Sequence, residues 1–115
     1  MPYLSIQTNS NVSAEQRKDL TTAASKIVAA QLNKPEGYVM TSFTPVPQMT
    51  LGGDASATAF LELKSIGVPD EKRNPLCAEL TKLITARCGI PADRIFIVLQ
   101  DVPARLWGHN GETIG

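Results

Sequence analysis

Residues 20–28 read LTTAASKIV and residues 76–84 read LCAELTKLI, and this pair of stretches decides the fold. In both, the apolar side chains fall at positions i, i+4, i+7 and i+8, a spacing that places them in one stripe along a helix. Each apolar position of the first stretch recurs 56 residues later, position 76 matching position 20. The two stretches therefore predict two amphipathic helices related by an internal duplication.

Each predicted helix lies between two runs of strand-forming residues. The four runs are residues 3–8, 37–43, 57–66 and 94–99. Pro35 and Pro91 stand at equivalent points of the two halves, with the same offset of 56. The chain is thus predicted to be a single domain, residues 1–115, with pseudo-repeats at about 1–52 and 57–115. Two βαβ units predict an α/β (α+β) fold: a four-stranded sheet with both helices on one face.

The ends of the first helix are marked by local signals. Ser13 can cap the first amides while Gln16 returns a hydrogen bond to the cap, the pattern of a capping box. From this start the apolar stripe predicts a helix that runs to about Leu32.

The start of the second helix is less well defined. Either Asn74 caps it and Pro75 is its first residue, or Pro69-Asp70 opens an irregular first turn. Its end is clearer, because glycine is favoured just beyond a helix and Cys88-Gly89 fits that position.

The predicted strands are apolar on both sides, which is typical of strands buried on both faces of a sheet. Two helices cover only one face. Oligomerisation is the simplest way to cover the other face, and we therefore expect an oligomer.

Composition excludes several classes of function. Lys plus Arg and Asp plus Glu number 11 each, so there is no excess positive charge to hold a nucleic acid. No apolar run approaches the ~20 residues of a membrane span, and the start does not resemble a secretory signal, so a cytoplasmic protein is expected. One histidine and two cysteines do not supply the ligand spacing of a metal site. Cys77 and Cys88 lie about 16 Å apart along one helix and cannot pair.

Pro2 directly follows the initiator methionine, and removal of Met1 would leave proline as the first residue. A terminal proline is a rigid secondary amine that titrates, whereas an internal proline nitrogen has no proton. An α-amino group ordinarily titrates at about 7.7 to 8.0, and burial or a nearby cation lowers that value. Pro2 is thus a candidate general base. The structural alternative is that it merely occupies the first position of a strand.

Lys34 lies in the connection between the first helix and the second strand. Ketonising the enol of an α-keto acid needs a group that moves a proton between oxygen and carbon, and a cation that holds the carboxylate. Pro2 can supply the first and Lys34 the second, and their proximity would lower the pKa of the amine. The alternative for Lys34 is a solvated cation at a helix end.

Six segments, in order along the whole chain, resemble one protein family. They are MPYLSIQTN (1–9), LNKPEGYV (32–39), MTLGGD (49–54), KSIG (64–67), PADRIFI (91–97) and WGHNGETIG (107–115). Together they are similar to the macrophage migration inhibitory factor (MIF) family of the tautomerase superfamily. The resemblance implies a homotrimer whose sheets line a central barrel, with active sites at the subunit interfaces.

The resemblance also implies roles for individual residues. It assigns the catalytic base to Pro2, the carboxylate-binding cation to Lys34 and a pocket wall to Tyr38. A substrate-binding turn that contributes a backbone amide falls on Ser65 and Ile66, followed by Gly67.

The sequence departs from the animal members at two further pocket positions, usually Tyr and Asn. Phe96 and Val98 stand there, which predicts a more apolar pocket. Trp107 and Ile114, near the C-terminus, are further candidates for its apolar wall, and the alternative is that they serve only packing. The animal CxxC is replaced by residues 58–61, TAFL, so thiol-disulfide chemistry has no basis here.

The sequence thus predicts a keto-enol tautomerase without cofactors that acts on phenylpyruvate-like α-keto acids, with dopachrome isomerisation as a side activity implied by the family. The main alternative is a cytokine-like binding protein with a vestigial pocket, for which a receptor is implied by family analogy only. A third is a small-molecule sensor domain on the same duplicated βαβ unit.

Overall fold

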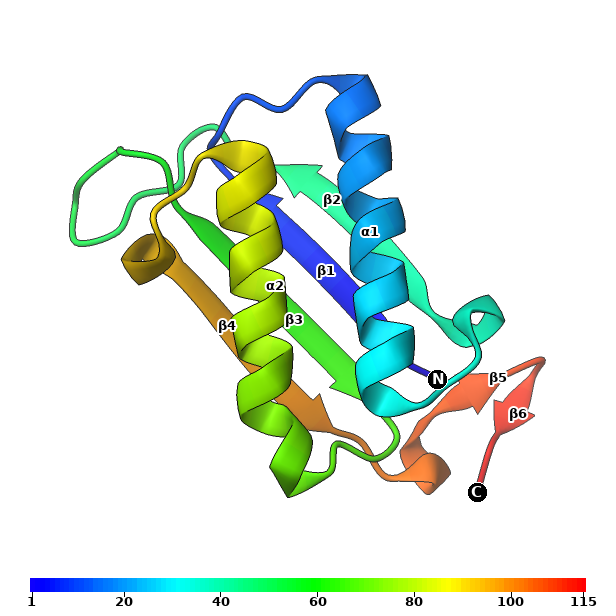
Figure 1. Cartoon of the computed structure of the whole chain (residues 1–115). Helices are drawn as coiled ribbons and strands as arrows, with labels where there is room; N and C mark the ends of the chain where they lie inside the picture. Colours follow the sequence, from blue (N-terminus) through cyan, green and yellow to red (C-terminus); the bar gives the residue numbers. More distant parts are fainter.

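Two helices lie side by side across one face of a four-stranded sheet (Figure 1). The computed structural model describes residues 1–115. Its main elements are β1 (Tyr3–Thr8), α1 (Ala14–Leu32), β2 (Met40–Pro45), β3 (Ala59–Ser65), α2 (Arg73–Cys88) and β4 (Ile95–Asp101). A short hairpin of β5 (Gly108–His109) and β6 (Glu112–Thr113) ends the chain. The fold class and the duplicated βαβ order are confirmed.

The sheet has the strand order β2-β1-β3-β4. Within each βαβ unit the strands are parallel, β1 with β2 and β3 with β4, whereas the central pair β1 and β3 is antiparallel. The antiparallel register pairs Tyr3 with Lys64 and Thr8 with Ala59. The N-terminal end of β1 therefore lies beside the C-terminal end of β3.

The core lies between the sheet and the two helices, and the predicted apolar stripes form its helical side. Alternate residues of β1 and β3 supply its other side, so that every second residue of β3 is buried. The buried residues of the two helices are Leu20, Ala24, Val28 and Leu32, then Leu76, Leu80, Leu83 and Ile84. Ile27 alone among the eight stripe positions is only partly buried. The helical period was thus predicted correctly.

The boundaries of α1 agree with the sequence prediction. The Gln16 amide donates to Ser13 Oγ at 3.1 Å, and the Ser13 amide donates to Gln16 Oε1 at 3.0 Å, which completes the capping box. The helix ends at Leu32, and Asn33 takes the left-handed conformation at φ 53°.

The start of α2 decides between the two predicted alternatives. A single 3-10 turn at Asp70–Lys72 leads into α2, and Arg73 and Asn74 are already helical. The prediction that Asn74 caps the helix is wrong, and the irregular first turn at Pro69-Asp70 is confirmed. Pro75 is tolerated there because the first four amides of a helix have no partner within it. The end at Cys88, with Gly89 left-handed at φ 69°, is confirmed.

The second strand begins later than predicted. Glu36–Tyr38 forms a 3-10 turn in which the Tyr38 amide donates to the Pro35 carbonyl at 3.0 Å, so β2 starts only at Met40. The strand-forming residues at 37–43 did not indicate this turn. The other strands differ from their predicted ranges by two residues or fewer at each end.

The face of the sheet away from the helices is more polar than predicted. Its positions on β1 and β3 are half-buried and include Ser5, Gln7, Glu62 and Lys64. The expectation of strands apolar on both sides is therefore wrong for β1 and β3, since an antiparallel pair does not need an apolar surface on both faces. Apolar side chains on this face concentrate on the outer strand β4, where Phe96 and Val98 are about half exposed.

Three features that composition excluded can be examined in the structure: a cysteine pair, a metal site and a membrane span. Cys77 and Cys88 are both free and both lie on α2. No three His, Cys, Asp or Glu side chains gather in a way that would hold a metal ion. Neither helix combines the length and the hydropathy needed to span a bilayer.

Candidate active site

Pro2 continues β1 by one residue at the sheet end where the central strands β1 and β3 meet. Its carbonyl accepts a hydrogen bond from the Met40 amide at 3.0 Å, which extends the pairing with β2. On the other side, the next step of the antiparallel register after Tyr3 and Lys64 places Pro2 opposite Ser65. The Pro2 side chain is fully buried. The sheet and the core thus hold Pro2 in one position.

Lys34 lies close enough to the N-terminus to act on its charge. It follows the left-handed Asn33, and its amide donates to the Ala29 carbonyl at 3.0 Å, so its backbone is fixed at the end of α1. Partial burial and, second, the positive charge of Lys34 hold the pKa of the Met1 amino group below its ordinary value. An amine at this end of the chain therefore loses its proton more readily than a free α-amino group.

A hollow of about 360 Å³ opens beside the N-terminus. Its lining consists of Met1, Gly37, Tyr38, Val39, Met40 and His109. Tyr38, predicted as a pocket wall, is 56% exposed here and ends the 3-10 turn that delays β2. The structure thus brings Tyr38 and the N-terminus into one concave surface.

A second hollow of about 550 Å³ adjoins the first, and the two share Met40. Its other lining residues are Tyr3, Lys64, Gln100, Val102, Leu106, Trp107 and Gly108. Trp107, predicted as an apolar wall, is therefore close to the Pro2 end of the sheet. The C-terminal hairpin β5–β6 closes this side of the molecule, near the N-terminus (Figure 1).

The predicted substrate-binding turn lies at the same edge and is rigidly held. The Ser65 carbonyl accepts from the Val102 amide at 2.8 Å. The Asp101 carboxylate accepts from the amides of Gly67 at 3.0 Å and Val68 at 3.2 Å. Gly67 has φ 86°, a conformation that glycine adopts without strain. Ile66, between the two anchored residues, is therefore constrained as well.

Phe96 and Val98 are not brought to this site within one chain. Phe96 pairs with Phe60 in β3, five residues before Ser65, so it lies about 16 Å further along the sheet than Pro2. It lines a separate hollow together with Gln7 and Met49. A pocket that contains both Pro2 and these two side chains would need a second copy of the chain.

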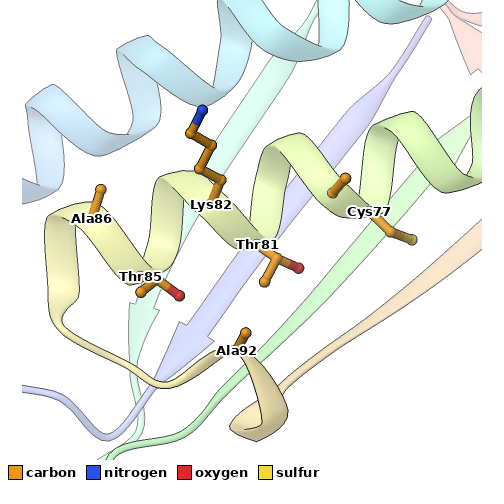
Figure 2. Close-up of a pocket in the computed structure, with 7 residues that line it drawn as sticks. Cys77, Thr81, Lys82, Thr85, Ala86 and Ala92 are labelled. Atoms are coloured by element: carbon orange, nitrogen blue, oxygen red, sulfur yellow. The ribbon is translucent and has the colours of Figure 1, made fainter.

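Another hollow, of about 650 Å³, contains none of the predicted site residues. It lies on the outer side of α2, where Thr81 and Thr85 point toward Ala92 and Lys82 points toward α1 (Figure 2). Burial raises the pKa of the Cys77 thiol at its end, so this cysteine is not activated as a nucleophile. Its lining holds one cation, Lys82, but no histidine or carboxylate that could act as a base, and the candidate site remains at the N-terminus.

Met40, Lys64 and His109 also line the two hollows, and of these only Lys64 was considered from sequence, as the alternative to Lys34 for holding the carboxylate. Lys64 directly precedes the predicted turn, and the alternation of β3 places it on the open face. Met40 and His109 gave no such signal, because the delayed start of β2 and the course of the C-terminal hairpin bring them to the N-terminus.

Comparison with known proteins agrees with the fold and with the order of motifs. The family model described as "Macrophage migration inhibitory factor (MIF)" matches residues 1–115. A macrophage migration inhibitory factor homolog of Brugia malayi is 37% identical and is aligned over 100% of both chains. The crystal structure of a homologue from Prochlorococcus marinus has a TM-score of 0.92 and 39% identity, and the match covers 98% of this chain and 99% of that one. A fused 4-OT protein solved as a symmetric trimer shares the fold, with a TM-score of 0.88, 20% identity and coverage of 97% and 95%.

Proposed function

We propose, since this chain belongs to the macrophage migration inhibitory factor family of the tautomerase superfamily, that it is a keto-enol tautomerase of the phenylpyruvate type. In this proposal the amine of Pro2, freed by removal of Met1, is the general acid and base. The observation that carries it is the N-terminal arrangement: a fully buried Pro2 at the end of β1, beside a hollow, with Lys34 close enough to lower the pKa of the terminal amine.

The proposed reaction needs only a proton transfer. The neutral Pro2 amine takes the proton of the enol hydroxyl, and the resulting ammonium returns a proton to the α-carbon as the carbonyl forms. The protein ends in the state in which it began, so no co-reactant is consumed. Lys34 holds the substrate carboxylate as a point charge with three donors, and the Ile66 amide supports the same carboxylate.

The position of Lys34 serves the chemistry twice. It attracts the anionic substrate, and it disfavours the protonated form of a neighbouring amine. A general base is most effective when its pKa lies near the working pH. An amine whose pKa lies below 7.7 to 8.0, the ordinary range, is neutral in a larger fraction of molecules at pH 7.

Two measurements on the native protein test this proposal together. Intact mass spectrometry should show a chain that lacks Met1, and an ultraviolet assay should show accelerated tautomerisation of phenylpyruvate. A protein that retains Met1 and is fully active would disprove the role of Pro2. A folded protein without Met1 and without activity would instead favour the cytokine-like binding role.

The assembly follows from where the site residues lie. Phe96 and Val98 are far from Pro2 in one chain, and both are about half exposed on the open face. We propose a homotrimer in which this face is covered and a neighbouring β4 completes each pocket. The fused 4-OT trimer supports this arrangement by its fold.

We therefore expect sedimentation to give the mass of a trimer at micromolar concentration. Covering the apolar side chains of β4 supplies the driving force for association. A stable, fully active monomer would contradict both the assembly and the shared pocket.

The apolar residues at positions 96 and 98 predict a substrate preference. A substrate phenol that entered this pocket would lose water without a guaranteed partner, at a cost of about 1 to 3 kcal/mol. Phenylpyruvate should therefore be preferred over its para-hydroxy analogue, and Val98→Asn should narrow the difference by restoring a donor. The measurement is kcat/KM for both substrates in both proteins. A preference for the hydroxylated substrate that Val98→Asn leaves unchanged would show that Val98 does not face the ring.

A further inference from the structure

One buried polar side-chain atom of this protein has no hydrogen-bond partner, and it lies beside Pro2. Ser65 is 0% exposed, and its Oγ neither donates to nor accepts from any group. Buried side-chain oxygens are normally satisfied. The two buried threonines follow that rule, because the Thr8 hydroxyl donates to the Thr58 carbonyl at 2.6 Å and the Thr58 hydroxyl donates to the Arg94 carbonyl at 2.7 Å. The unsatisfied Ser65 hydroxyl therefore indicates a hydrogen-bond partner that is absent while Met1 is attached.

The sheet register shows which residue lies opposite Ser65 on the neighbouring strand. Tyr3 pairs with Lys64, so the next pair across the antiparallel strands is Pro2 with Ser65. Both residues are buried and fall in phase with the buried residues of their strands, on the side of the sheet that the helices cover. Directly opposite residues of an antiparallel pair have Cα atoms about 4.5 to 5.5 Å apart. The proline ring and the serine hydroxyl are thus close neighbours on the same side.

Removal of Met1 changes the hydrogen-bonding capacity of this neighbour. With Met1 attached, the Pro2 nitrogen belongs to a tertiary amide that has no hydrogen to donate. Without Met1, the same nitrogen is an amine that carries one hydrogen when neutral and two when protonated. The missing donor therefore arises when the chain is processed.

We propose that Ser65 Oγ accepts a hydrogen bond from the Pro2 amine of the processed chain and so positions the catalytic base. Ser65 is suited to this role because its backbone is held on both sides. Its carbonyl is bound by the Val102 amide, and the turn that follows is bound by Asp101. This inference rests on the proposed function, because it requires Met1 to be removed and Pro2 to act as the base.

Ser65 acts among several charged and titratable groups. They are Lys34, Tyr38 and His109 on the side of the first hollow, and Lys64 and Asp101 on the sides of Ser65. Lys34 disfavours the ammonium form of the amine, whereas a hydroxyl oxygen that accepts from the ammonium favours it. The two residues therefore shift the pKa of Pro2 in opposite directions.

Ser65→Ala should lower the pKa of the Pro2 amine by about one unit, the size expected for the loss of a hydrogen bond to a charged group. The measurement is an NMR titration of the processed chain labelled with carbon-13 at Pro2. Ser65→Cys keeps a side chain of similar volume but offers only a weak acceptor, so it should also lower the pKa of the Pro2 amine. Ser25→Ala, at a half-buried serine of α1, is the matched control and should leave the titration unchanged.

A second readout compares thermal unfolding in chains with and without Met1, the former made by chemical synthesis. With Met1 retained, Ser65→Ala removes an unsatisfied buried hydroxyl and should raise the Tm. With Met1 removed, the same substitution breaks a hydrogen bond and should lower the Tm. An equal change in both chains, or an unchanged pKa of Pro2, would overturn the role of Ser65. Failure of the proposed function itself would be seen in a different measurement: the chain that retains Met1 would be fully active.

Discussion

Pro2→Gly is expected to lower kcat/KM for phenylpyruvate by about 10²- to 10⁴-fold, the usual contribution of a positioned base. Glycine is also small, so Met1 should still be removed and a primary amine would remain at the terminus. What is lost is the rigid ring, which the core holds and which keeps the nitrogen in one direction. The large effect of a small change would therefore report geometry rather than the mere presence of an amine.

The control for this substitution is Pro47→Gly, in an exposed turn. It makes the same chemical change away from the site and is expected to cost only the small stability change of a loop proline, about 0.4 to 1 kcal/mol. Circular dichroism should show that both variants fold. Turnover by Pro2→Gly at the level of Pro47→Gly would exclude Pro2 as the base.

Lys34→Ala is expected to reduce kcat/KM for phenylpyruvate by about ten- to a hundredfold, because a hydrogen bond to a charged group contributes about 1.5 to 3 kcal/mol. An uncharged ester of the substrate should be affected much less. The same substitution removes a cation that disfavours the protonated amine, so the acid limb of the pH profile should move to higher pH. The sign is opposite to that expected for Ser65→Ala.

Lys26→Ala provides the control for the loss of a positive charge. Lys26 lies within α1, one turn or more before Lys34, but its ammonium is paired with Glu36 at 3.5 Å and is well exposed, so its removal should leave kcat/KM nearly unchanged. Equal losses by Lys34→Ala on the acid and the ester would mean that Lys34 does not hold the carboxylate. Lys64, which lines the adjoining hollow, would then be the next candidate.

The residues that were predicted correctly depend on interactions over short stretches of chain. The stripe from Leu20 to Val28 and its repeat at Leu76 to Ile84 defined both helices, because burial of one helix face requires that spacing. The capping box at Ser13 defined the first boundary because its hydrogen bonds join residues only three positions apart. The candidate base and cation, Pro2 and Lys34, come from the Met-Pro start, the position of the lysine and the family resemblance, and their roles stay predictions.

The features that the sequence did not reveal depend on contacts between distant parts of the chain. Tyr3 meets Lys64 and Met40 only because β3 and β2 pair with the two edges of β1. That register and the path of the C-terminal hairpin also explain three other features. They are the polar open face, the separation of Phe96 from Pro2 and the position of His109 beside Met1.

By itself, then, the sequence determined the two helices and the duplicated order of elements, and it indicated the two groups of the proposed chemistry. Only the tertiary structure decided which side chains surround those groups, including the unpartnered hydroxyl of Ser65. The physical reason is that helix periodicity and capping act within a few residues, whereas strand register is set by the packing of the whole sheet against its helices.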